Sequence, residues 1–454
     1  MPEREFDVIV IGAGPSGEVI AGRLGEAGLG VALCERELVG GECSFYACMP
    51  SKALLRAGEL IGEAGRVPGL QLASERVDAD ATLARRDEVI HDLDDSGMEP
   101  WLSERGVELV RKAGALDGER RVKAGDDVLL ARRAVVLASG TRASLPPIDG
   151  LADAEPWTNR EGTTAKEVPA SLIVIGGGPV GCELAQAWQS LGAKVTLLEM
   201  ADRLLANEEP FASGEVTTAL RGGGVRVETG VEISAVTRDE EGFEVVLSGE
   251  QTMSAAELMV AAGRRPNTDE LGLETVGLEP GEWIEVDDSL RVEGRDWLYA
   301  IGDVNNRSLL THAGKYQASV AAKVILGDEA TATSDTAGPP RVTFTDPQVA
   351  AVGLTMAGAT DDGLNVREVR VATSGNAGAS FHGRNTDGTS QLVVDEDRGV
   401  VVGATFVGYQ TAEMLHAATI AITAKLRLSQ LWEAIPAFPT RGEIWLRLLE
   451  EYGL

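Results

Sequence analysis

The chain has no run of eighteen or more apolar residues, so no transmembrane helix is expected among its 454 residues. Positive charge is scarce as well, with 41 Lys and Arg against 71 Asp and Glu and a formal net charge of −30 at pH 7. Nucleic acids and anionic membranes both attract a positive field, so we expect neither as a partner. The excess of acid indicates a solubilising surface or, as the alternative, adaptation to salt. The N-terminal residues lack the basic, apolar and cleavage regions of a signal peptide, which predicts a cytoplasmic protein.

Cysteine and histidine are also rare, with four of each in the whole chain. Zinc in proteins usually has four ligands, and no second Cys/His cluster accompanies Cys43 and Cys48, so we predict no metal site. In a reducing compartment a close cysteine pair indicates catalysis or metal binding rather than a structural disulfide. The pair is therefore a candidate redox site, with two structural cysteines as the alternative. Cys34 and Cys182 are interpreted as small buried side chains.

What the chain does contain is a strand–turn–helix–strand pattern that occurs twice. The first copy turns at Gly12 and reaches Glu35, and the second turns at Gly176 and reaches Glu199. In both copies the acidic residue lies 23 positions after the first glycine. In dinucleotide-binding units of this type, the glycines permit a tight turn, close approach of the pyrophosphate and close helix packing, while the helix N-terminus faces the phosphates. The terminal Glu can accept hydrogen bonds from ribose hydroxyls.

Two such units in one chain imply two different nucleotides, most simply FAD and a nicotinamide. The first unit predicts cofactor contacts at Gly12, Gly14, Pro15, Ser16, Gly17, Glu35 and Arg36. The second unit predicts them at Gly176, Gly178, Pro179, Val180, Gly181, Glu199 and Val231. Glu199 favours NADH because a carboxylate repels the 2′-phosphate of NADPH, whereas Arg203 nearby keeps NADPH as the alternative.

Breaks in composition indicate how the chain is divided. The double proline at 146–147 marks one boundary, and the small-residue stretch 327–340, which ends in a second double proline, is typical of a linker. Beyond it, the pattern predicts strands within 341–355 and 390–407 and a helix over 412–425. We therefore predict an α/β protein with two Rossmann-like dinucleotide-binding domains and a C-terminal α+β domain, divided as 1–155 (FAD, first part), 156–280 (NAD(P)), 281–338 (FAD, second part) and 341–454.

With these motifs, nearly the whole chain resembles the flavoprotein disulfide reductases of the dihydrolipoamide dehydrogenase, glutathione reductase and mercuric reductase type. The redox signature of that family is close to GGTCxNxGCxPSK, and residues 40–52 read GGECSFYACMPSK. Segments 262–267, 301–303 and 344–347 also resemble family motifs. The resemblance implies a homodimer joined through the C-terminal domain. It also implies cofactor contacts at Gly41, Glu42, Lys52, Ala115, Ala138, Ser139, Gly140, Gly263, Gly302, Asp303, Leu310, Thr311 and His312.

The same resemblance implies a path for electrons. A hydride would pass from the nicotinamide to the flavin, and electrons would then reach a Cys43–Cys48 disulfide, with Cys48 next to the flavin and Cys43 attacking the substrate. Lys52 and Glu183 match an ion pair beside the flavin, with a surface role as the alternative. A helix beginning near Thr311 would point at the flavin. His312 is interpreted as a packing or capping residue, and Pro179 replaces a tyrosine that covers the flavin in many relatives.

The chain departs from the family where a catalytic histidine is expected. The family pattern is His-Pro-Thr-x-x-Glu, and residues 438–443 read Phe-Pro-Thr-Arg-Gly-Glu. Phenylalanine cannot transfer a proton, and loss of a positioned acid–base group typically slows a reaction by about 10²–10⁴-fold. Phe45, Tyr46 and Ala47 also depart from the redox signature. Either they shape a different pocket, in which Tyr46 or the catalytic candidate Glu443 supplies a proton, or they repack around Phe438.

These observations predict an FAD-dependent NAD(P)H oxidoreductase with a redox-active Cys43–Cys48 pair and a small-molecule electron acceptor that is a disulfide or another electrophile. Phe438 disfavours a dihydrolipoamide dehydrogenase, and the missing C-terminal cysteine pair disfavours a mercuric reductase. A quinone or dye reductase that uses the flavin directly is one alternative, because it needs no catalytic base. A redox sensor with low turnover is another, although the retained Cys43, Cys48, Lys52 and Glu183 argue against it.

Overall fold

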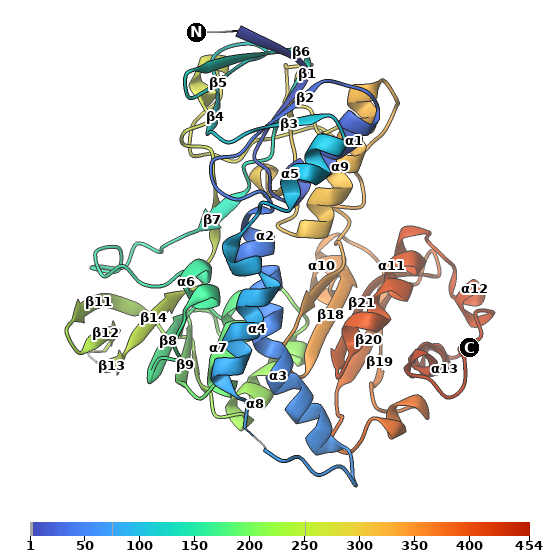
Figure 1. Cartoon of the computed structure of the whole chain (residues 1–454). Coiled ribbons are helices and arrows are strands. Elements are labelled where there is room, and N and C mark those ends of the chain that lie inside the picture. Colours follow the sequence, from blue (N-terminus) through green and yellow to red (C-terminus); the bar gives the residue numbers. More distant parts are fainter. Residues whose placement is uncertain (1–2, 75, 250) are drawn as a thin grey trace. The chain divides into compact units, whose positions relative to one another are not determined.

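The computed structural model describes residues 3–74, 76–249 and 251–454 (Figure 1). The chain forms two compact units, and each is assembled from three separate stretches of sequence. The first unit comprises Met1–Pro50, Asp87–Ser144 and Arg264–Thr336, and the second comprises Ser51–Arg86, Leu145–Gly263 and Ala337–Leu454. The domain limits drawn from the sequence motifs stay a prediction.

The first unit is built on a seven-stranded sheet with the order β3-β2-β1-β6-β5-β4, in which β16 also pairs with β6. Its central strands are parallel. They are apolar because strands of a parallel sheet are buried on both faces. The strands are β1 (Glu3–Ile11), β2 (Val31–Cys34), β3 (Val107–Val110), β4 (Gly114–Leu116), β5 (Arg121–Ala124), β6 (Asp127–Leu137) and β16 (Leu298–Ala300). A second small sheet pairs β7 (Thr141–Ala143) with β15 (Arg264–Pro266).

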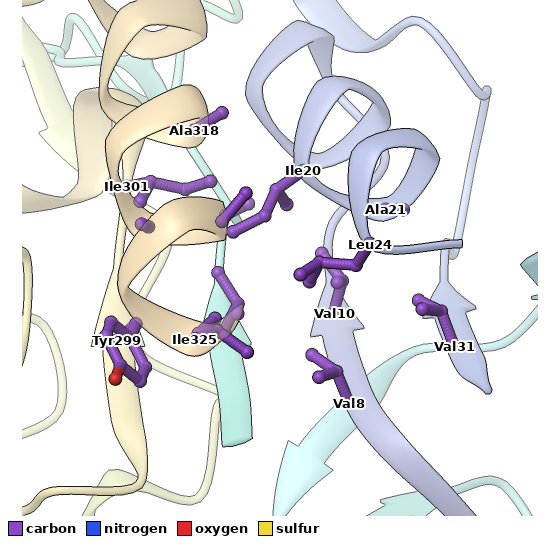
Figure 2. Packing of buried hydrophobic residues seen from close by; sticks show 14 of the residues in the cluster. Val8, Val10, Ile20, Ala21, Leu24, Val31, Tyr299, Ile301, Ala318 and Ile325 are labelled. Carbon is purple, nitrogen blue, oxygen red and sulfur yellow. The ribbon is translucent and has the colours of Figure 1, made fainter. Parts of the chain in front are cut away.

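Two helices, α1 (Pro15–Glu26) and α9 (Thr311–Leu326), lie side by side against this sheet (Figures 1 and 2). Ile20 and Leu24 of α1 point into the same buried cluster as Ala318 and Ile325 of α9 (Figure 2). Helix α1 begins with proline at its first position, where no backbone N–H is needed. The unit also contains α2 (Gly41–Phe45), the start of α3 (Cys48–Arg66) and α5 (Met98–Glu104).

The second unit contains a parallel four-stranded sheet with the order β10-β9-β8-β14, formed by β8 (Ser171–Ile175), β9 (Lys194–Glu199), β10 (Arg226–Thr229) and β14 (Glu257–Val260). A three-stranded antiparallel sheet joins β11 (Ile233–Asp239), β12 (Gly242–Leu247) and β13 (Thr252–Ala255). Leu54 of α3 shares a buried cluster with Leu184 and Trp188 of α7 (Pro179–Ser190). The remaining helices of this region are α4 (Ala79–Val89), α6 (Asn159–Thr164) and α8 (Pro210–Gly222).

The C-terminal part of the second unit is a five-stranded antiparallel sheet flanked by helices. Its strands are β17 (Arg341–Thr343), β18 (Gln348–Gly353), β19 (Val366–Ala372), β20 (Thr389–Asp395) and β21 (Val400–Gly408), in the order β17-β18-β21-β20-β19. Its helices are α10 (Met356–Asp361), α11 (Leu415–Thr423), α12 (Leu428–Trp432) and α13 (Ile444–Tyr452). The predicted strands are confirmed, whereas the helix predicted over 412–425 is shorter and follows a 3-10 turn, Thr411–Met414.

The predicted α/β architecture, with two dinucleotide-type sheets and a C-terminal α+β part, is confirmed. Both strand–turn–helix–strand patterns form as expected, as β1–α1–β2 and as β8–α7–β9. No helix in the described ranges combines the length and the apolar character needed to cross a membrane.

Candidate functional site

The first glycine-rich turn is held by the acidic residue that ends β2. The Glu35 carboxylate accepts the backbone N–H of Ala13 at 2.7 Å and that of Glu37 at 2.7 Å. A Cβ atom at Gly17 would lie 1.9 Å from the carbonyl oxygen of Gly12, so this helix–turn contact requires glycine. A Cβ atom at Gly14 would meet no described atom within 4 Å. The N-terminus of α1 is thus open to a ligand at Gly14 and tightly packed behind it.

The second turn repeats this arrangement. Glu199 accepts the N–H of Gly177 at 2.5 Å and that of Ala201 at 2.7 Å, which matches the contacts of the first turn position by position. A Cβ atom at Gly181 would lie 1.8 Å from the carbonyl oxygen of Gly176. The two glycine-rich turns therefore share their hydrogen bonding as well as their sequence pattern, although they belong to different compact units.

Arg203 is engaged in its own loop. Its guanidinium donates to the carbonyl oxygens of Ala206, Glu208 and Leu205 at 2.5, 2.9 and 3.3 Å. A guanidinium bound to three carbonyl groups would have to leave them in order to pair with a phosphate.

A cavity of about 350 Å³ opens in the first unit at the carboxyl ends of its parallel strands. Its walls include Gly12, Glu35, Arg36 and Ser139, which were predicted from the sequence as cofactor contacts. Ligands of open parallel sheets bind at this edge because the strand ends and helix N-termini meet there. The cavity therefore has the position and the lining expected of a dinucleotide site.

Beside it, Arg264 lies between two carboxylates. Its guanidinium is 3.7 Å from the Glu42 carboxylate and 3.9 Å from that of Asp303. The Thr141 hydroxyl donates to Asp303 at 2.8 Å. Burial raises the pKa of Asp303, and the contacts with Thr141 and Arg264 offset part of that rise. Asp303 and Glu42 were predicted from the sequence, whereas Arg264 and Thr141 were not. Arg264 lies in the family-like segment 262–267, and Thr141 directly follows the predicted contact Gly140.

The structure brings Cys43 and Cys48 together. Helix α2 ends at Phe45 and α3 begins at Cys48, so the chain turns between the two cysteines. Both are half-buried thiols, and they are hydrogen-bonded to each other. The Cys48 sulfur lies 3.5 Å from the Thr311 hydroxyl at the start of α9. The hydrogen bond with Cys48 and burial raise the pKa of Cys43, while Thr311 and Lys315 act in the opposite direction.

In the second unit, the Lys52 ammonium lies 2.7 Å from the Glu183 carboxylate. The Glu183 side chain is 5% exposed and also accepts the backbone N–H of Phe344 at 2.9 Å. The Lys52 ammonium sits 4.7 Å from the centre of the Phe344 ring. The predicted ion pair is therefore present, and its carboxylate is not a surface group.

The two ends of the C-terminal motif, residues 438–443, differ in their exposure to solvent. Phe438 is 77% exposed, whereas Glu443 is 7% exposed and accepts the backbone N–H of Gly378 at 3.2 Å. Arg441, between them in the sequence, lies over the Tyr409 ring, 5.8 Å from its centre. His382 also contacts that ring, and burial together with Arg441 lowers the pKa of His382.

The other predicted site residues also have definite positions. Cys34 and Cys182 are 1% and 0% exposed, which confirms them as buried side chains. His312 is exposed on the first turn of α9, which begins at Thr311 as predicted. The first unit holds Gly12, Gly14, Pro15, Ser16, Gly17, Glu35, Arg36, Gly41, Glu42, Cys43, Cys48, Ala115, Ala138, Ser139, Gly140, Gly302, Asp303, Leu310, Thr311 and His312. The second unit holds Lys52, Gly176, Gly178, Pro179, Val180, Gly181, Glu183, Glu199, Val231, Gly263 and Glu443.

Comparison with known proteins agrees with this geometry. Residues 6–321 match the family model described as pyridine nucleotide-disulphide oxidoreductase, and residues 339–448 match the dimerisation domain of the same family. The chain is 32% identical to a dihydrolipoyl dehydrogenase of Zymomonas mobilis over 448 residues, which cover 96% of each chain. It is 33% identical to a mercuric reductase of Streptomyces lividans over 451 residues, 96% of this chain and 94% of the relative.

Solved structures show the same fold. The HOCl-induced flavoprotein disulfide reductase RclA from Escherichia coli gives a TM-score of 0.86 at 23% identity, covering 98% of this chain and 99% of that one. LpdA from Mycobacterium tuberculosis gives a TM-score of 0.86 at 23% identity, covering 99% and 100%. Since the family models match residues 6–321 and 339–448, the chain belongs to the pyridine nucleotide-disulphide oxidoreductase family of enzymes, whose members use FAD and NAD(P)H.

Proposed function

We propose that this FAD-dependent oxidoreductase passes electrons from NADH to the Cys43–Cys48 pair and then to a small-molecule disulfide or another electrophile. The observation that carries the proposal is the meeting of the two sulfurs with the Thr311 hydroxyl, 3.5 Å from Cys48. Two thiols in hydrogen-bond contact can close to a disulfide with little movement of the chain. When bound, FAD supplies a two-electron carrier between the nicotinamide and this pair.

The residues of the first unit fit FAD. The Glu35 carboxylate at the end of β2 is placed to accept ribose hydroxyls, the open backbone at Gly14 is placed for the pyrophosphate, and Asp303 offers a carboxylate for the ribitol chain. The Arg264 guanidinium offsets the negative charge of the Asp303 and Glu42 carboxylates. These side chains would hold and orient the cofactor.

The second unit fits the nicotinamide nucleotide, and we propose NADH as the preferred form. Glu199 ends β9 beside the glycine-rich turn, and a carboxylate at this position would accept ribose hydroxyls and repel the extra phosphate of NADPH. Arg203, the nearby cation that could accommodate a 2′-phosphate, donates to carbonyl groups of its own loop. The geometry therefore supports NADH over NADPH.

The acceptor differs from that of enzymes with the complete C-terminal motif. Position 438 carries an exposed phenylalanine, so no proton is exchanged there. This disfavours dihydrolipoamide oxidation as the physiological reaction. The same residue favours a second candidate function, direct reduction of a quinone or dye by the flavin, which requires no base. The match of residues 339–448 to the dimerisation domain supports a homodimer.

An anaerobic NADH titration of the purified protein, followed by its visible spectrum, tests the proposal. If the pair is redox-active, the protein takes up twice the electrons that the flavin alone can hold, and a long-wavelength thiolate-to-flavin band appears. The Cys43→Ser variant should then take up half as many electrons. Uptake that stops at the flavin in the unmodified protein would exclude the dithiol reaction and favour the quinone reductase.

A further inference from the structure

Gln317 is a fully buried amide in the middle of α9, in the first unit. Its Oε1 atom accepts the backbone N–H of Gly302 at 2.7 Å and the side-chain amide of Asn305 at 3.0 Å. Its Nε2 atom donates to the Asp335 carboxylate at 2.8 Å. An ionised carboxylate only accepts hydrogen bonds, whereas the other two groups donate them. A single orientation of the Gln317 amide therefore satisfies all three contacts.

Asp335 fixes that orientation. Its side chain is fully buried, and the Arg307 guanidinium donates to its two oxygens at 2.9 and 3.1 Å. The same guanidinium donates to Asp288 at 3.1 Å. The buried carboxylate thus has both a counter-ion and an amide donor. Buried polar groups whose hydrogen bonds are all made form a rigid network, so Gln317 is held at its outer end by a fixed acceptor.

The turn that Gln317 holds carries Asp303. Residues Gly302–Asn305 form one 3-10 turn, and Gly302 enters it with a φ of +75°. A Cβ atom at Gly302 would lie 2.8 Å from the Ser16 hydroxyl on the first turn of α1. The backbone of the turn is therefore fixed both by the Gln317 amide and by packing on the helix that follows the first glycine-rich turn. Any change in the Gln317 amide would shift the backbone beside Asp303.

We propose that Gln317 is a positioning residue for FAD binding, and that Asp335 sets the direction in which its amide points. This inference rests on the proposed contact of Asp303 with FAD and does not depend on the cysteine pair. Gln317 acts through the backbone of the turn rather than by touching the cofactor. Its partner Asp335 lies near the end of the first unit, which ends at Thr336, so the last stretch of that unit contributes to the cofactor site.

Release of FAD from the purified holoprotein after dilution, followed by flavin fluorescence, tests this role without turnover. Gln317→Glu places a second carboxylate against Asp335 and removes a donor, and should speed release about tenfold. Asp335→Asn should speed release less, because the asparagine oxygen can still accept from Gln317. The double variant Gln317→Glu/Asp335→Asn again joins one carboxylate to one amide. It should release FAD within about threefold of the unmodified rate, because the two changes compensate each other.

Asp328→Asn is the matched control, because Asp328 is an exposed acid just beyond the end of α9, and it should leave the release rate unchanged. A double variant that releases FAD as fast as Gln317→Glu would overturn the inference. So would a double variant that fails to fold where Asp335→Asn folds. A loss of packing alone would not be repaired by a second substitution of this kind.

Asp303→Ala tests the contact on which the inference rests, and it should also speed FAD release. An unmodified release rate in this variant would exclude the proposed contact of Asp303 with FAD, whereas the double variant alone decides the pairing of Gln317 with Asp335. The NADH titration reports on the cysteine pair and is independent of both. Failure of the dithiol reaction and failure of the positioning role are therefore distinguishable.

Discussion

Glu443 accepts the backbone N–H of Gly378 at 3.2 Å, so the acidic residue that closes the C-terminal motif is bound to the main chain. It is 7% exposed, and a Cβ atom at Gly378 would lie 2.0 Å from the carbonyl carbon of Thr440. The two segments are therefore packed against each other at this contact. Glu443 was predicted from the sequence to be catalytic, and the structure gives it a structural contact. A catalytic role and a structural role make different predictions.

The structural role of Glu443 predicts a loss of stability. Glu443→Ala leaves the buried N–H of Gly378 without its acceptor, which should lower the free energy of unfolding by about 1–3 kcal/mol. Glu450→Ala is the control, because Glu450 is an exposed acid on the neighbouring helix α13. Urea unfolding measures both variants. A Glu443→Ala protein of unchanged stability but altered pH–rate profile would instead support the catalytic prediction.

The matching contacts of Glu35 and Glu199 predict that each residue affects the binding of a different cofactor. Glu35→Ala should weaken FAD retention, and Glu199→Ala should weaken NADH binding, each by about 10–100-fold, because hydrogen bonds to charged groups contribute about 1.5–3 kcal/mol. Flavin absorbance after gel filtration measures the first effect, and the NADH concentration dependence of flavin reduction measures the second. Each variant is the control for the other. If Glu35→Ala kept its FAD and lost NADH binding, the assignment of the two units would be reversed.

The Lys52–Glu183 pair predicts a combined effect on stability and electron entry. Lys52→Met leaves a carboxylate that is 5% exposed without its cation, and should lower the free energy of unfolding by about 1–3 kcal/mol. This is less than for a fully buried pair, because the Lys52 side chain is 37% exposed. If the pair acts on the flavin as the resemblance implies, reduction by NADH should slow at least about tenfold. Stopped-flow absorbance measures that rate, and Lys52→Arg should restore most of it.

Glu18 predicts a dependence of stability on pH. Its pKa is about 7 in the folded protein, above the value of about 4.3 for an unperturbed glutamate. The stabilisation linked to its proton is therefore complete below about pH 4.3 and is lost as the pH rises through about 7. Glu18→Gln should flatten the fall in thermal unfolding midpoint between pH 5 and 8, whereas Glu26→Gln, an exposed acid on the same helix, should not. If the unfolding midpoints of Glu18→Gln and the unmodified protein changed with pH in the same way, Glu18 would not be the source of the pH dependence.

Local motifs predicted the main elements correctly. The two turns beginning at Gly12 and Gly176 were predicted because a positive φ, a close glycine packing contact and an acid 23 positions later are all set by short-range geometry. The helix start at Thr311 was implied by the family resemblance, and Cys34 was interpreted as a small buried side chain; both agree with the structure. The helix predicted over 412–425 was too long at both ends, since apolar residues alone do not set where an α-helix begins and ends.

Short motifs were enough to predict the family, the two nucleotide-binding units and the cysteine pair, because each motif consists of residues close together in the chain. Which groups surround that pair became known only from the packing of distant segments. Thr311 is 263 positions from Cys48, and its hydroxyl could not be assigned to the sulfur without the packing of α9 on α1. The contact of Glu443 with Gly378, 65 positions away, also arises from packing. Contacts between distant segments depend on how the helices and sheets bury their apolar faces, which no local pattern specifies.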